Sequence, residues 1–331
     1  MFEEPVLQTL QMFVGEILCW LPVLVMRLRK GDAPAVEAAP LLGKKRITSF
    51  KQTLFLATPA VLDFTATTLL NVGLLYTPVS IYQMVRGSII LFVGLFSVLW
   101  LKRTITTLEW LSLFVVVFGV FIVGLSGSLS SAEESDSSAA FNGDMLFGLF
   151  IIVVGIMFNA LQFVVEEKAL ASLEVSPLEV VGYEGMYGAA VTFATMCAGH
   201  LLGHRTRADF WDMGYAFQVM FTNGPVLVSS LLIMVCISTF NFSGVSLTHT
   251  LSATSRSTID TSRTLLVWLV SLALGWEQFK TLQLLGFSLL LYGTLVFNGV
   301  IEAEKSRLLP NWLKQRSTQP LITIDEPLER F

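Results

Sequence analysis

The sequence predicts an all-α polytopic membrane protein. Of its 331 residues, 53% are apolar and only 14% are charged, and so few charges cannot cover a soluble body of this size. The charges are also segregated, because nine apolar stretches of at least 18 residues contain only seven of the 46 charged residues. A stretch such as Val115–Leu125 is apolar on every side and does not alternate, which favours a membrane helix over a soluble helix or a β-barrel strand.

Each of the nine stretches has the length of a membrane-spanning helix. In chain order they are residues 6–26, 54–75, 79–101, 110–127, 145–165, 180–199, 226–248, 251–274 and 281–300. Four of the nine contain no charge, and the others contain Glu16, Asp63, Arg86, Glu184 and, together in 251–274, the three residues Arg256, Asp260 and Arg263.

The positions of Lys and Arg predict the orientation in the membrane, because cytoplasmic loops are enriched in these residues. The segments on one side of the nine spans contain 15 Lys and Arg and those on the other contain 3. The basic side includes the 301–331 tail, which is therefore expected in the cytoplasm. The opposite side includes a Ser-rich, acidic luminal linker at 128–144 and an expected short interfacial helix within 203–224.

An internal repeat is indicated by a shift of 174 residues, which places 93–127 over 267–301 without a gap. The identities include Ser97 with Ser271 and Gly119 with Gly293. The shift maps the third span onto the eighth and the fourth onto the ninth. Because this displacement of five spans is odd, the two halves are inverted, which is typical of secondary transporters.

The repeat predicts the domain organisation. The first repeat covers 1–127, and the second half covers 145–300. Because the span 145–165 has no partner in the first repeat, we expect a five-plus-five architecture whose first helix of ten is missing from this sequence.

The charges within the spans are the candidate site, because each charge at a helix centre costs roughly 2.5–3.5 kcal/mol and needs a partner, water or a function. Arg256, Asp260 and Arg263 have i, i+4, i+7 spacing and share one helical face with the carboxylate between two guanidiniums. Ser and Thr surround them, as expected of a helix that lines a wet cavity. A structural ladder of ion pairs is the alternative.

Arg86 in the third span lies at nearly the same depth in the membrane as the charges of the span 251–274, since the shift of 174 residues aligns Arg86 with Asp260. Guanidinium groups bind carboxylate or phosphate through two parallel hydrogen bonds, which favours an anionic or zwitterionic substrate. Because four acids also lie within the spans, a proton-coupled or amine-recognising site is the alternative interpretation. Further substrate-binding candidates are Tyr82, Gln83, Asn241, Asp63 and Glu184.

Several strings in the sequence are similar to a known family. They are SIYQMVRG (80–87), VVEEK (164–168), GYEGMYG (182–188), FNFSGVSLT (240–248), LSATSRSTIDTSRT (251–264) and LALGWEQF (272–279). From about residue 6 to 300, the chain resembles the drug/metabolite transporter superfamily, and within it subfamily F of the nucleotide-sugar-transporter-like solute carrier family 35. The resemblance implies ten helices in inverted five-helix repeats, cytoplasmic termini and a substrate cavity between the halves. It carries over Arg86, Asp260, Arg263, Glu166, Glu167 and Glu184 as motif residues.

These observations predict a secondary active transporter of a small polar, anionic or zwitterionic metabolite of the nucleotide-sugar class, working by alternating access. The alternatives are a proton-coupled carrier of amino acids or organic cations, and a non-transporting scaffold. We find no nucleophile paired with a base and no cluster of metal ligands, so the sequence does not indicate an enzyme, a cofactor or a metal. It also has no basic tract that would indicate binding of nucleic acid.

The expected location is an intracellular membrane of the lysosome, vacuole or Golgi, which the resemblance implies. Two acidic dileucine patterns, Glu37–Leu42 and Glu304–Leu309, fit recognition by sorting adaptors. The expected partners are therefore a small-molecule substrate, the lipid bilayer and such adaptors, and a homodimer stays an open alternative.

Overall fold

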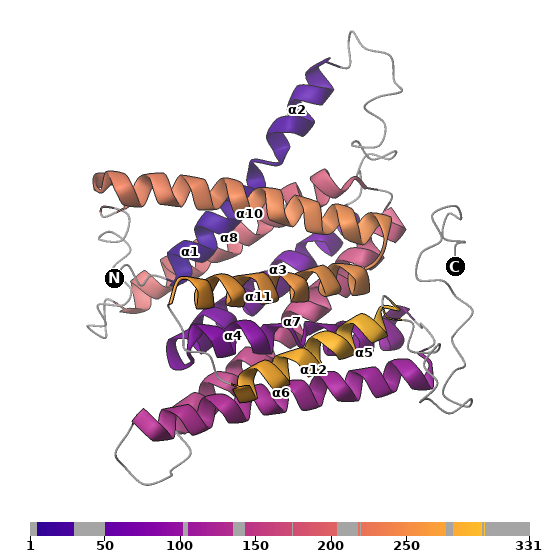
Figure 1. Ribbon diagram of the computed structural model, residues 1–331. Coiled ribbons are helices and arrows are strands. Elements are labelled where there is room, and N and C mark those ends of the chain that lie inside the picture. The colour runs from indigo at the N-terminus through magenta and orange to yellow at the C-terminus, as the bar shows by residue number, and fades with distance from the viewer. Residues whose placement is uncertain are drawn as a thin grey trace. The chain divides into compact units, whose positions relative to one another are not determined.

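The computed structural model describes residues 5–29, 50–101, 105–134, 143–173, 175–203, 218, 220–275, 281–299 and 301. Within these ranges the chain forms helices and no β-strand, which confirms the predicted all-α class (Figure 1). The helices are α1 (Pro5–Ile17), α2 (Trp20–Arg29), α3 (Phe50–Tyr76), α4 (Val79–Arg86), α5 (Ile89–Leu101), α6 (Thr107–Glu134), α7 (Gly143–Leu173), α8 (Pro177–Gly203), α10 (Gly224–Thr250), α11 (Ala253–Ala273) and α12 (Thr281–Phe297).

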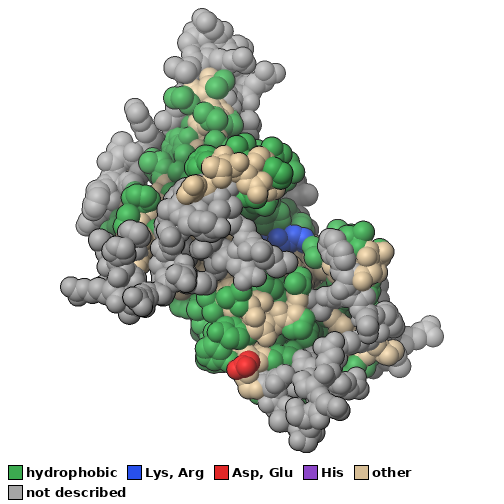
Figure 2. Space-filling model, turned by 90° about the vertical axis from the view of Figure 1, so that its left-hand side faces the viewer, with side chains coloured by type: hydrophobic (Ala, Val, Ile, Leu, Met, Phe, Trp, Pro, Cys, Tyr) green, Lys and Arg blue, Asp and Glu red, His purple; other side chains and the backbone are tan. Residues whose placement is uncertain are grey.

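All nine predicted spans fall on helices. Among the described residues, five segments are long and apolar enough to cross a membrane, and they are Leu7–Val25, Leu54–Tyr76, Ile81–Leu101, Gly143–Leu173 and Gly224–Thr250. Large apolar side chains such as Phe114 and Leu232 are more than 60% exposed. Figure 2 shows mainly hydrophobic and uncharged side chains on the described part of one face. Such a surface suits the hydrocarbon of a bilayer, so the chain is a polytopic membrane protein.

Two predicted spans differ from the structure because each consists of two helices. The span 6–26 breaks at Leu18 and Cys19, where backbone bonds reach back only three residues. Pro22 explains this break, since its ring has no N–H for the Leu18 carbonyl and clashes with it. The span 79–101 breaks at Gly87 and Ser88, where the Ser88 hydroxyl donates to the Val85 carbonyl at 2.7 Å and replaces a helical bond.

Helix starts follow the capping patterns in the sequence. Before α6, the Thr106 backbone N–H donates to the Glu109 carboxylate at 2.6 Å. Before α8, the Ser176 N–H donates to the Glu179 carboxylate, and the Glu179 N–H donates to the Ser176 hydroxyl. Helix α6 extends to Glu134, so the first residues of the predicted 128–144 linker are helical. Of the expected interfacial helix within 203–224, most residues lie outside the described ranges.

The chain divides into two compact units. Unit 1 contains residues 1–68 and 165–250, and unit 2 contains residues 69–164 and 251–331. Each unit therefore takes residues from both predicted repeats, and the long helices α3 and α7 contribute to both units. Compactness does not test sequence repetition, so the assignment of repeats stays a prediction.

In unit 1, α1 packs between α8 and α10. It packs against α8 at glycines spaced three apart, where a Cβ on Gly185 would lie 2.7 Å from the Ile17 backbone nitrogen. The α1–α10 pair is parallel, because successive turns of α1 contact successive turns of α10 in the same direction. Small residues allow this close approach of membrane helices. A separate apolar core contains Val23, Leu56, Ala169, Leu170, Val181 and Val245.

In unit 2, α6 and α12 lie side by side and antiparallel (Figure 1). A Cβ on Gly119 would lie 2.7 Å from the Gly286 carbonyl oxygen, and one on Gly293 would lie 2.8 Å from the Ser112 carbonyl oxygen. Helix α11 packs against α4, α5 and α12. The core of this unit includes Met84, Ile90, Leu113, Ile156, Phe287 and Leu290.

Candidate substrate-binding site

Two of the three charged residues of α11 form an ion pair with each other, and the third contacts an aromatic ring. Asp260 is buried and binds Arg263, whose Nη2 lies 2.6 Å from the Asp260 Oδ1, and the Arg263 side chain is 33% exposed. Arg256 is buried, and its Cζ lies 3.9 Å from the centroid of the Phe163 ring on α7. The sequence indicated the pairing of Asp260 with Arg263, but it did not indicate Phe163.

Arg86, at the end of α4, lies beside these residues. It donates to the Tyr82 hydroxyl over 3.4 Å, and its Cζ lies 5.8 Å from the centroid of the Tyr82 ring. Arg86, Tyr82, Arg256 and Asp260 are all close enough to Arg263 to interact with it electrostatically. The structure therefore brings together five of the predicted site residues, and we call this set the arginine cluster: Tyr82, Arg86, Arg256, Asp260 and Arg263.

The arginine cluster lies where α11 crosses the break between α4 and α5. The Thr261 hydroxyl donates to the Gly87 carbonyl at 3.2 Å, next to Arg86 and Asp260 in the sequence. Gly87 and Thr261 are 174 residues apart, which is the shift of the predicted repeat. The sixth candidate of this region, Gln83, is half-buried on α4.

The hydroxyl groups of α11 do not require the wet cavity that the sequence led us to expect. Ser257 and Thr258 donate to the Thr254 carbonyl at 2.7 and 3.0 Å, and Ser262 donates to the Thr258 carbonyl at 3.1 Å. Ser252 caps the start of the helix by accepting from the Ser255 N–H. These hydroxyls are thus satisfied by the helix itself, so the charged side chains carry the argument for a polar site.

The acids within the predicted spans of unit 1 occupy other helices. Glu16 on α1 is almost fully buried and accepts a hydrogen bond from the Asn241 side chain on α10. The same helix pair is joined by Gln11 with Ser230 at 3.2 Å, and Cys19, at the break after α1, bonds to Ser238 on α10 at 3.2 Å. Asn241, predicted as a substrate contact, is here a partner of a buried carboxylate.

Asp63 and Glu184 are also buried. Asp63 on α3 accepts a hydrogen bond from the Thr67 hydroxyl one turn later, at 3.2 Å. Glu184 lies on α8, next to Gly185 in the contact with α1. On α7, Glu166 is fully buried and Glu167 is half-buried. Buried acids within membrane helices are found in ion and proton pathways and also in structural pairs.

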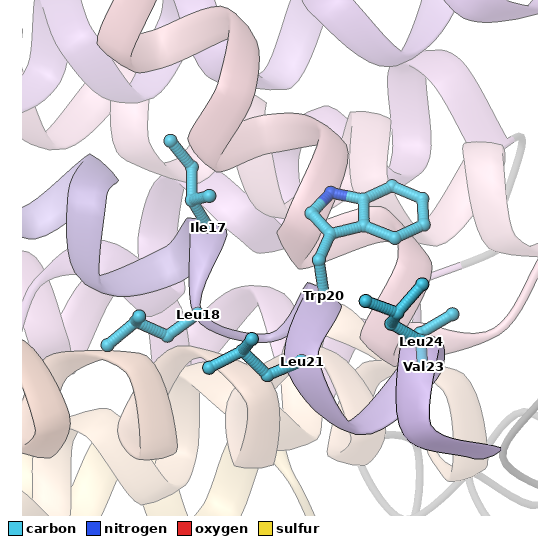
Figure 3. A pocket seen from close by; sticks show the side chains of 6 residues that line it. All are labelled: Ile17, Leu18, Trp20, Leu21, Val23 and Leu24. Carbon is cyan, nitrogen blue, oxygen red and sulfur yellow. The ribbon is translucent and has the colours of Figure 1, made fainter. Parts of the chain in front are cut away.

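A cavity of about 270 Å³ lies at the break between α1 and α2 (Figure 3). It is lined only by Ile17, Leu18, Trp20, Leu21, Val23 and Leu24. Apart from the indole N–H of Trp20 these side chains are apolar, so the cavity has too few polar groups to orient a polar metabolite, and none of the six is a predicted site residue. In the described part of the chain, no three His, Cys, Asp or Glu residues are grouped as metal ligands would be.

Comparison with known proteins gives consistent results. A model of the nucleotide-sugar transporter family matches residues 3–251. An uncharacterized protein of Schizosaccharomyces pombe is 41% identical over 90% of this chain and 87% of its own length. Human Solute carrier family 35 member F6 is 36% identical over 93% of this chain and 81% of its own length. A solved structure described as "Crystal structure of protein" superposes with a TM-score of 0.54 and 13% identity over 92% of this chain and 90% of that chain, which shows a shared fold.

Proposed function

The chain belongs to the nucleotide-sugar transporter family, and we propose that it is a secondary active transporter that moves a small anionic or zwitterionic metabolite across an intracellular membrane by alternating access. Its named relatives are solute carriers and not enzymes, so its general function is membrane transport. The substrate class and the mechanism are our proposal.

The observation that carries the substrate class is the composition of the arginine cluster. Three guanidiniums, Arg86, Arg256 and Arg263, gather near the break between α4 and α5, and Asp260 forms an ion pair with Arg263. In an apolar environment, guanidiniums gathered in this way favour binding of carboxylate or phosphate groups. Guanidinium groups also match the planar geometry of these anions.

Alternating access requires two halves that exchange roles, and we propose the inverted repeat with the 174-residue shift as their basis. Contacts in unit 2 support it. The shift takes Gly119 to Gly293, and it relates the two groups close to Gly119, the Gly286 oxygen and the Leu290 nitrogen, to the Ser112 oxygen and Val116 nitrogen close to Gly293. The contact between Gly87 and Thr261 joins equivalent positions, as expected on a two-fold pseudo-axis.

An alternative function is supported by the buried acids of unit 1. Glu16, Asp63 and Glu184 favour a proton-coupled carrier of amino acids or organic cations. A non-transporting scaffold is the third possibility, and it requires none of these charges.

The orientation and location belong to the proposal as well. We propose a cytoplasmic 301–331 tail and a luminal side for the residues between α6 and α7, in a lysosomal, vacuolar or Golgi membrane. Adaptor binding at Glu37–Leu42 and Glu304–Leu309, and a homodimer, are part of the same proposal. Both dileucine patterns lie outside the described residues.

Uptake by the purified protein in liposomes tests the proposed function. The probes are labelled UDP-glucose as an anion, glucose as a neutral molecule and tetraethylammonium as a cation, each compared with protein-free liposomes. Saturable uptake of UDP-glucose alone is the expected result. Uptake of the cation alone would favour the acids of unit 1 as the site, and uptake of none of the three would favour the scaffold.

A further inference from the structure

The cavity at the break between α1 and α2 has a buried side and an exposed side (Figure 3). On the buried side, Val23 belongs to the apolar core of unit 1, and the Trp20 ring packs edge-on against Tyr183 of α8, with 5.0 Å between the ring centroids. On the other side, Leu21 and Leu24 are exposed among the described residues. The described part of the chain therefore leaves this apolar cavity open at the surface of unit 1.

The depth of the cavity in the membrane follows from the position of its residues in the sequence. They lie within the candidate span Leu7–Val25, where the surroundings of an exposed side chain are the hydrocarbon chains of lipids. Along α2, Arg27 follows Leu24 by about 4.5 Å and Arg29 follows it by about 7.5 Å, at a rise of 1.5 Å per residue. An acyl chain in the cavity would therefore have its polar headgroup at the end of α2 that contains these two arginines.

The sequence that continues from the cavity is basic. The segment 27–53 contains seven Lys and Arg and two acidic residues, and it lies on the side of the spans that is richer in Lys and Arg. Basic residues directly after a span attract anionic lipid headgroups, which are concentrated in the cytoplasmic leaflet. An apolar cavity followed by basic residues thus complements both parts of an anionic phospholipid, whereas another apolar helix would gain nothing from the charges.

We propose that the cavity at the break between α1 and α2 binds an acyl chain of an anionic phospholipid, whose headgroup lies at the end of α2 where Arg27 and Arg29 stand. The bound lipid would cover the exposed side of α2 next to the break. This site is in unit 1, whereas the arginine cluster is in unit 2. The inference goes beyond the proposed function and does not depend on which molecule is transported.

Native mass spectrometry of the purified full chain in detergent tests the headgroup part of the proposal. The probes are palmitoyl-oleoyl phosphatidylserine and the phosphatidylcholine with the same acyl chains, at equal concentrations. Wild type should bind phosphatidylserine at least about fivefold more than phosphatidylcholine, since each basic residue near a membrane surface strengthens binding of anionic lipid by about fivefold. The double variant Arg27→Gln/Arg29→Gln should lose most of this preference. The matched control, Lys102→Gln/Arg103→Gln directly after α5, should keep it.

A second substitution tests the cavity itself. Leu21→Trp places a larger side chain at the cavity and should weaken phosphatidylserine binding by about fivefold or more, because the acyl chain loses apolar contacts. Val228→Trp, on the exposed side of α10, is the matched control and should bind the lipid as wild type does. An unchanged elution volume and Tm would verify the folding of each variant.

Three results would overturn the proposal. These are equal binding of the two lipids by wild type, a full preference for phosphatidylserine in the folded Arg27→Gln/Arg29→Gln variant, and wild-type binding of phosphatidylserine by the folded Leu21→Trp variant. None of these measurements involves transport, so each of these failures would leave the proposed function unaffected.

Discussion

Replacing the glycines between α6 and α12 tests the packing of unit 2 and the internal symmetry proposed for it together. In Gly293→Ala, the new Cβ would lie 2.8 Å from the Ser112 carbonyl oxygen and 3.1 Å from the Val116 nitrogen, while ordinary contact begins at 3.4 Å. Both are backbone atoms, so the helices must separate by roughly 0.6 Å. Such overpacking costs about 1–3 kcal/mol. The helix propensity of Ala returns about 0.5–1 kcal/mol of this, which leaves a net loss of about 1–2 kcal/mol.

Gly119→Ala should be equally destabilising, because its Cβ would meet equivalent backbone atoms 2.7 Å away. The assay is thermal unfolding in detergent followed by tryptophan fluorescence, with a Tm decrease of roughly 2–6 °C expected for either variant. The double variant should lose less than the sum of the two, since one separation accommodates both methyl groups.

Gly143→Ala is the matched control, because among the described residues no atom beyond its chain neighbours and its own helix backbone lies within 4 Å of the position of its Cβ. It should leave the Tm unchanged or slightly higher. Refutation would come from Gly119→Ala and Gly293→Ala proteins that unfold at the wild-type temperature, or from clearly unequal effects of the two substitutions.

Three further predictions concern the buried polar groups and the orientation. Asn241→Ala removes an amide donor from the buried Glu16 carboxylate and should lower the stability by about 1–3 kcal/mol, measured as a lower Tm. Ser243→Ala, on the exposed side of α10, is the control and should not lower the Tm. Equal Tm values for the two variants would contradict this prediction. Asp260→Asn breaks a buried ion pair and should cost about 3 kcal/mol, so a wild-type Tm would show that Asp260 does not hold Arg263. Tags inserted at residues 135 and 325 should be accessible to protease from opposite sides of the membrane, and access to both from one side would overturn the proposed orientation.

Much of the fold follows from the sequence because the membrane imposes a simple requirement. A span must satisfy its backbone internally and present apolar side chains, so runs such as Val115–Leu125 locate helices without knowledge of their neighbours. The cap before α6 is also a local feature, since Thr106 and Glu109 stand three residues apart, but it was not predicted. The break before α2 was missed although Pro22 marks it, because the hydropathy of the span is unaffected by a proline.

The residues of the arginine cluster were predictable because they are charged or, like Tyr82, stand close to a charge in the sequence. Arg86, Asp260 and Arg263 stand out because charges are rare within the spans, and the structure brings them together. Phe163 did not stand out, since one phenylalanine among many in apolar helices carries no signal of the guanidinium that it contacts. The contact between Asn241 and Glu16 could not be predicted, because a sequence does not show that the two residues lie opposite each other on different helices.

The central claim, that the arginine cluster binds an anionic group of the transported substrate, is tested most directly by UDP-glucose uptake into liposomes containing Arg263→Lys or Arg86→Lys protein. Lysine keeps the charge and removes the planar fork, so the account predicts correctly folded variants whose KM for UDP-glucose rises by about tenfold or more. Folding would be verified by an unchanged elution volume and Tm. Folded variants with the wild-type KM would contradict the claim, because the arginines would then serve only to hold helices together.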